Sequence, residues 1–185
     1  MFIQTESTPN PLTLKFIPGI AVMPQGAQAQ TAFYTSAEAA KDSPLAQALF
    51  GIDGVSAVFL AADFLSVTRT DSMDWITLKP MLLHTIMDHF VAGRPVIIGK
   101  QDAEENTEED SEIVAQIKEL IETRVRPAVA MDGGDIVYRG FHDGIVQLEL
   151  HGACSGCPSS SATLKSGIEN MLKHYVPEVV SVEAV

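Results

Sequence analysis

Two cysteines, Cys154 and Cys157, are the residues of this chain whose type and spacing most directly permit chemistry. They lie three positions apart in the segment Gly152–Pro158, and the 185-residue chain has no other cysteine. Disulfide scaffolds use several pairs, so one Cys-x-x-Cys pair in a chain of this length indicates a metal site or a redox centre. The spacing lets two sulfur atoms from one turn meet on a metal or close into a small disulfide.

Three chemistries fit the pair, and the spacing does not choose between them. A thioredoxin-type redox pair normally belongs to a strand-helix-strand fold, whereas a hairpin is expected before this loop and no redox partner is evident. A closed zinc site needs four ligands, so His142, His151 and His174 would be the possible additions to the two cysteines. An iron-sulfur centre takes four thiolates, which two chains would supply as one pair each.

The residues beside the cysteines are expected to shape the loop rather than to react. Pro158 favours the first position of a helix, so Cys157 is expected at or near the N-cap, where the dipole and free N–H groups stabilise a thiolate. Ser159–Ser161 are expected to satisfy N–H groups at the helix start, the alternative being hydrogen bonds to cluster sulfides. Gly133 and Gly134 are expected to serve a backbone turn with positive φ. Neither cysteine is expected to complete an apolar face.

The elements that position this loop follow from periodicity and turn residues in the C-terminal part of the chain. The expected order is helix, strand, strand, helix, strand, with Asp-Gly as a strong hairpin signal. The predicted elements are a helix over Ile113–Val125, capped by Ser111 and ended by Pro127, a hairpin of Ile136–Phe141 and Ile145–Leu150, a helix through Leu164 and Tyr175, ended by Pro177, and a strand at Val179–Val182.

The N-terminal part is expected to hold two hairpins and several helices. Its predicted elements are strands at Phe2–Glu6 and Leu12–Ile17, short helices beginning at Ser36 and Ser43, the second ended by Gly51, strands at Val55–Leu60 and Phe64–Thr70, a helix from Asp74 through Phe90, and an edge strand or tether at Val96–Ile98. Pro80 must lie in the first turn of its helix or kink it. Met73, Met81 and Met87 are expected in the core rather than in a metal site. Trp75, His84 and His89 are expected in core or solvent, with a partner surface as the alternative.

An acidic run separates the two parts. Gln101–Glu112 has seven acidic residues and no basic one. Because such a run repels itself and cannot build a core, it is expected to be solvated. We therefore predict an α+β protein of two small domains, residues 1–100 and 113–185, joined by an acidic flexible linker at 101–112. An acidic tract that docks a basic partner is the alternative.

Composition narrows the class of function. The 24 acidic and 12 basic side chains give a net charge of -12, which disfavours nucleic acid and anionic membrane surfaces as partners. No apolar run reaches the roughly 18 residues of a membrane span, and the N-terminus lacks the features of a signal or transit peptide. A cytoplasmic protein or a mature form is therefore expected. No Ser-His-Asp arrangement, phosphate-binding glycine loop or paired-carboxylate signature stands out, so the protein is not expected to be an enzyme.

Longer segments around the cysteines resemble a known family. Met131–Ile136, Leu150–Lys165 and Ile168–Glu169 resemble the C-terminal domain of the NifU-like (Nfu) iron-sulfur scaffold and carrier family, and Thr5–Pro11 with Leu14–Phe16 resembles the N-terminal domain of its two-domain form. The resemblance implies that Cys154 and Cys157 bind a 4Fe-4S cluster at a homodimer interface. It also implies transfer of the cluster to apo-proteins, supply by upstream assembly proteins, and a mitochondrial matrix location for a mature eukaryotic form. The alternative is a thiol-disulfide oxidoreductase that uses the same pair.

Overall fold

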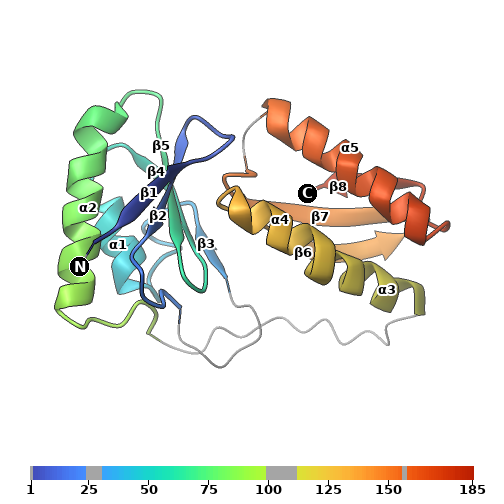
Figure 1. Cartoon of the computed structure of the whole chain (residues 1–185), viewed down its shortest axis with the longest axis horizontal. Coiled ribbons are helices and arrows are strands. Elements are labelled where there is room, and N and C mark those ends of the chain that lie inside the picture. The colour runs from blue at the N-terminus through green and yellow to red at the C-terminus, as the bar shows by residue number, and fades with distance from the viewer. Residues whose placement is uncertain (1, 24–30, 99–111, 156–157) are drawn as a thin grey trace. The chain divides into compact units, whose positions relative to one another are not determined.

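The chain forms two compact units, residues 1–100 and 101–185 (Figure 1). The computed structural model describes residues 2–23, 31–98, 112–155 and 158–185, with the backbone alone at 158–161. Each unit combines a β-sheet with helices, so the expectation of a two-domain α+β fold is confirmed. The predicted acidic linker lies outside the described residues except for Glu112, which begins a helix.

The first unit is one antiparallel sheet with helices on one side. Its elements are β1 (Gln4–Ser7), β2 (Thr13–Ile17), β3 (Ala32–Tyr34), α1 (Pro44–Phe50), β4 (Val55–Leu60), β5 (Leu65–Arg69) and α2 (Trp75–Val91). The strand order is β1-β2-β5-β4-β3, and every neighbouring pair is antiparallel. Both helices lie on the same side of this sheet (Figure 1).

Two cross-strand rows of apolar side chains build the core of the first unit. In one row Phe16 pairs with Leu65, which pairs with Leu60, and all three are fully buried. The second row contains Leu14, Val67, Val58 and Tyr34. Alternate residues of a strand share one face, so these rows cover the face that packs against Leu45 and Leu49 of α1 and Leu78, Leu82 and Ile86 of α2.

The two hairpins and helix α1 are confirmed, whereas the helix predicted to begin at Ser36 is wrong. Residues 37–42 form turns, although Ser36 Oγ does accept a hydrogen bond from the Ala39 N–H at 3.1 Å. The Ala-rich composition favours a helix, but Ser43 and Pro44 start a new element before the run is long enough to offset the cost of nucleation. Strand β3 is absent from the sequence prediction, because three residues are too few to show a period.

The last segment of the first unit is a tether rather than a strand. Ser43 Oγ donates to the Val96 carbonyl at 2.7 Å, and the Ile98 N–H donates to the Asp42 carbonyl at 2.6 Å. Pro80 is the sixth residue of α2, so of the two expected alternatives, a place in the first turn or a kink, the first is excluded. Because proline has no backbone N–H, α2 lacks the hydrogen bond that residue 80 would otherwise donate to the Ile76 carbonyl.

The second unit is a three-stranded sheet with helices packed on one core. Its elements are α3 (Glu112–Leu120), a π-helical turn η1 (Ile121–Val125), α4 (Arg126–Met131), β6 (Gly134–His142), β7 (Ile145–Gly152), α5 (Pro158–Tyr175) and β8 (Ser181–Ala184). Strand β7 is central, antiparallel to β6 and parallel to β8. The predicted order of helix, strand, strand, helix, strand is confirmed, and Asp143 and Gly144 form the hairpin turn with φ of 51° and 81°.

The first helical segment of this unit continues past Pro127, contrary to the prediction that this proline ends it. The Arg126 N–H bonds to the Ile121 carbonyl, five residues back, which is the hydrogen-bond pattern of a π turn. This widened turn places Pro127 at the second position of α4, where an N–H is not needed. The apolar side chains Ile117, Ile121, Val125 and Val129 thereby stay on the core along α3, η1 and α4.

Candidate functional site

The loop that carries Cys154 begins where β7 ends against the first residues of β6. Gly134 and Gly152 are cross-strand partners, and the Ala153 N–H donates to the Gly133 carbonyl at 3.2 Å. Gly152 has a φ of 63°, a conformation that strongly favours glycine and turns the chain into the loop. The Ser155 N–H then donates to the Gly152 carbonyl at 3.1 Å. The loop leads to α5, which begins at Pro158 as predicted.

Cys154 is buried rather than displayed. Its exposed fraction is 6%, and it belongs to the hydrophobic core of the second unit together with Ile136 and Ile168. The expectation that neither cysteine completes an apolar face is therefore wrong for Cys154. A strand-end cysteine followed by serine and glycine gives no sequence signal for burial. Cys157 lies outside the described residues, and so do the side chains of Ser159–Ser161.

The surroundings of Cys154 hold it as a neutral thiol. Burial, and to a smaller extent the negative charges of Asp132 and Asp135, raise the pKa of Cys154 to about 12. A metal binds the thiolate, so a metal that takes this sulfur must displace its proton. The thiolate stabilised by the helix dipole was expected at Cys157, which lies outside the described residues, so that expectation stays a prediction.

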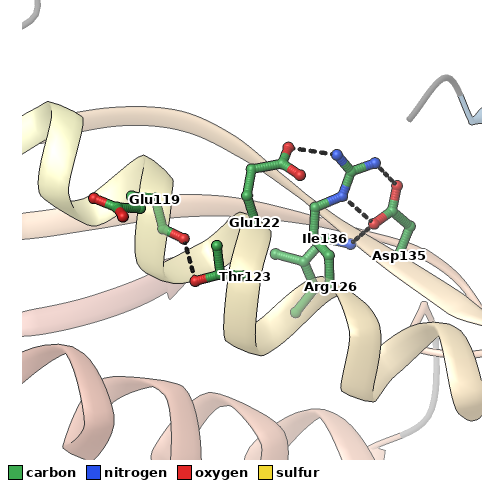
Figure 2. A network of polar contacts seen from close by, with 6 residues as sticks. All are labelled: Glu119, Glu122, Thr123, Arg126, Asp135 and Ile136. Atoms are coloured by element: carbon green, nitrogen blue, oxygen red, sulfur yellow. Dashed lines mark hydrogen bonds and ion pairs between the residues drawn. The ribbon is translucent and has the colours of Figure 1, made fainter. Parts of the chain in front are cut away.

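An ion pair fixes the strand residue that follows Gly134 (Figure 2). Arg126 donates from Nε to Asp135 Oδ1 at 2.8 Å and from Nη2 to Oδ2 at 2.7 Å. Asp135 Oδ1 also accepts from the Ile136 N–H at 2.8 Å, and Arg126 Nη1 donates to Glu122 at 2.5 Å. These hydrogen bonds raise the pKa of Arg126. The sequence analysis did not predict this contact, because two residues nine positions apart, one in a helix and one in a strand, have no characteristic spacing.

The histidines considered as further zinc ligands do not gather at the loop. His142 and His174 are exposed, and His151 Nε2 lies 2.9 Å from Glu149 Oε1. Arg139 donates to the other oxygen of Glu149 at 2.6 Å. These contacts lower the pKa of Glu149 against the opposing effect of burial. Within the described ranges no three His, Cys, Asp or Glu side chains are grouped as metal ligands.

The residues singled out in the first unit serve packing or face solvent. His89 is buried with 1% exposed, and its ring meets Phe90 edge-on at 5.7 Å, whereas His84 is exposed. Trp75 donates from Nε1 to the Pro11 carbonyl at 3.0 Å. Met81 and Met87 are exposed, so their predicted place in the core is wrong. The outward side of α2 carries them, because Leu78, Leu82 and Ile86 already fill its inner side.

None of the described helices is both long enough and apolar enough to span a membrane.

Comparison with known proteins assigns both units to domains of NifU-related proteins. The NifU-like domain matches residues 117–183, and the domain described as "Scaffold protein Nfu/NifU N terminal" matches residues 3–93. These matches follow the two compact units and occur in the order that the resemblance implied.

Curated relatives match along the whole chain. The human protein named "NFU1 iron-sulfur cluster scaffold homolog, mitochondrial" is 52% identical over 187 residues, which cover 100% of this chain and 72% of that protein. The Arabidopsis thaliana proteins named "NifU-like protein 4, mitochondrial" and "NifU-like protein 5, mitochondrial" are 53% and 54% identical, and the chain spans 65% and 67% of their lengths. This chain therefore belongs to the two-domain Nfu family of NifU-like proteins.

Proposed function

We propose that this chain is an iron-sulfur cluster scaffold and carrier that binds a 4Fe-4S cluster through Cys154 and Cys157 of two chains and passes it to apo-proteins. One observation carries the proposal. The cysteine loop joins β7 to α5 inside the segment that matches the NifU-like domain. The human relative is named as an iron-sulfur cluster scaffold homolog, which supports the scaffold part of the proposal.

The number of thiolates supports a shared site. A 4Fe-4S cluster commonly takes four cysteine sulfurs, whereas one chain has two cysteines. Two chains that face each other across a two-fold axis supply the full set with identical loops. Such a dimer is coupled to its cargo by mass action and weakens when the cluster leaves. Release then follows when thiolates of a recipient replace one pair.

The environment of Cys154 argues against the oxidoreductase alternative. A thiol that attacks a disulfide is accessible and has a lowered pKa. Cys154 has neither property, because it is buried and its pKa is raised.

The setting follows from the same proposal. The protein is a carrier without catalytic activity of its own, its partners are upstream assembly proteins and recipient apo-proteins, and its N-terminal domain positions those partners. The net charge of -12 disfavours nucleic acid and anionic membranes as partners. The names of the relatives support the mitochondrial option, and nothing in the comparisons supports the cytoplasmic one.

Anaerobic reconstitution tests the proposal. The full chain is incubated with iron and sulfide, and its visible absorption, iron and sulfide content and light-scattering mass are measured. We expect about four irons per two chains and a shift from monomer toward dimer on loading. Cys154→Ser and Cys157→Ser should each lose the cluster, because a hydroxyl is a poor ligand for iron in such clusters.

Ser155→Ala is the matched control, since it changes the same loop and leaves both sulfurs. It should load like the unchanged protein. A complete cluster on a monomer without added thiol would contradict the shared site, and a full cluster on the double serine variant would contradict the cysteine ligands.

A further inference from the structure

Gly134 lies so close to Cys154 that a side chain at this position has no room. A methyl group there would come within 2.5 Å of Cys154 Sγ, 2.8 Å of the His151 carbonyl oxygen and 3.0 Å of the Cys154 backbone nitrogen. All three distances are shorter than or at the limit of what packed carbon atoms tolerate. We infer that Gly134 is a positioning residue for Cys154, because its missing side chain provides the space that the thiol occupies.

The backbone conformation at position 134 does not explain why this residue is glycine. The described glycines with positive φ include Gly133, Gly144 and Gly152 but not Gly134. Alanine could adopt the backbone of Gly134 without strain, since this residue is the first of strand β6. The demand for glycine at this position is therefore steric and comes from the cysteine loop. This separates its role from that of Gly133, which the turn itself requires with a φ of 80°.

The start of β6 is held by hydrogen bonds on both sides of Gly134. Before Gly134, the Gly133 N–H donates to the Ala130 carbonyl at 3.1 Å. After it, Asp135 is bound by two hydrogen bonds from Arg126 at 2.7 and 2.8 Å (Figure 2). We therefore expect the clash between a side chain at Gly134 and Cys154 to be relieved by movement of the cysteine loop.

The cysteine loop meets the start of β6 through backbone groups. The Ala153 N–H donates to the carbonyl of Gly133, the residue before β6, at 3.2 Å, and Gly152 pairs with Gly134. Displacement would take Cys154 out of the apolar cluster that it shares with Ile136 and Ile168. Gly134 thus keeps this thiol packed in the metal-free chain. The further expectation that a displaced Cys154 holds a cluster less firmly rests on the proposed function.

The test measures thiol exposure in the metal-free full chain. In a Cys157→Ser background Cys154 is the single thiol, so its alkylation by iodoacetamide is followed by intact mass. Gly134→Ala should speed this reaction about fivefold or more, since reactivity follows exposure. Gly140→Ala is the matched control in the same strand, because a methyl group there meets nothing nearer than His142 Nε2 at 3.3 Å. An unchanged rate in Gly134→Ala, with circular dichroism intact, would overturn the inference.

A thermal double-mutant cycle covers the case in which Gly134→Ala folds poorly. Melting temperatures are compared for Gly134→Ala, Cys154→Ala and the double variant. The loss caused by Gly134→Ala should shrink when the sulfur is absent, because the closest contact is with Sγ. Equal losses in both backgrounds would show that the backbone contacts alone require glycine. Neither measurement uses iron, so failure of this inference and failure of cluster binding are distinguishable.

Discussion

Arg126 and Asp135 form a two-point ion pair that joins the first residue of α4 to the start of β6. Nε and Nη2 of Arg126 lie 2.8 and 2.7 Å from the two carboxylate oxygens, and Asp135 is 3% exposed. A paired guanidinium and carboxylate of this geometry constrains direction as well as distance. The pair thereby fixes the strand residue beside which the cysteine loop packs.

Loss of this pair should destabilise the second unit. Arg126→Ala leaves the buried carboxylate of Asp135 without its guanidinium, and we expect a loss of about 3 kcal/mol in the free energy of unfolding. Glu122→Gln is the control, because the exposed Glu122–Arg126 contact should contribute less than about 1 kcal/mol. Urea titration followed by far-ultraviolet circular dichroism measures both. Equal losses of unfolding free energy in the two variants would show that the buried Arg126–Asp135 pair contributes no more to stability than the exposed contact.

Cys154→Ser should cost stability as well as cluster binding. The serine hydroxyl would lie in the apolar cluster around Ile136 and Ile168, and burial of a hydroxyl without a partner costs about 1–3 kcal/mol. Cys154→Ala should cost less, since it adds no polar group. Differential scanning calorimetry of the metal-free variants checks this order. A serine variant as stable as the unchanged chain would contradict the burial of Cys154.

His89 should make the first unit less stable as the pH falls. Burial lowers the pKa of His89, with Arg94 adding to the effect and Asp88 and two backbone carbonyls opposing it. The unfolded chain binds a proton at about pH 6.5, and the folded chain does so only at lower pH. Stability is therefore full above the unfolded pKa and decreases below it, by up to about 1.4 kcal/mol per pH unit, until the folded pKa is reached.

Fluorescence isolates this effect, because Trp75 is the single tryptophan and lies in the first unit. Its emission during urea unfolding at pH 5.5 and 7.5 reports that unit. His89→Leu should remove most of the dependence between these values, whereas the exposed His84→Gln should retain it. A pH dependence that survives in His89→Leu would assign it to other groups.

The acidic segment should be the first site of limited proteolysis. Because Gln101–Glu112 has a single apolar residue, Ala103, and cannot build a core, a glutamate-specific protease should cut there first. We expect two fragments that each retain circular dichroism, and a C-terminal fragment that still takes up a cluster. Early cleavage within α2 or α5, or an unfolded fragment, would count against two autonomous domains.

Local signals in the sequence predicted most elements, because their causes are local. Ser43 before Pro44 specifies the start of α1, and its Oγ accepts from the Ala46 N–H at 3.2 Å. Asp143-Gly144 specifies the β6–β7 turn, where both residues have positive φ. The predictions that fail concern competition between local and distant contacts. Pro127 should end a helix by itself, yet a π turn lets the helical path continue along the core.

The site was predicted in part for the same reason. The spacing of Cys154 and Cys157 marks the loop, and Pro158 marks the helix after it. The burial of Cys154, the steric role of Gly134 and the Arg126–Asp135 pair all depend on how β6 meets β7 and α4. Contacts of this kind join residues that are many positions apart. The same residue types also occur on protein surfaces, so the sequence alone does not indicate these contacts.

Ser43 also affects the predicted linker between the two domains. Its hydroxyl, together with the Asp42 carbonyl, binds the backbone of Val96 and Ile98, so these two residues are attached to the first domain. Releasing residues 96–98 would add roughly 10 Å to the contour length of the linker. A longer linker lowers the effective concentration of one domain near the other. If the first domain holds a partner, as the proposed function has it, this buried helix cap would influence how often that partner encounters the cysteine loop.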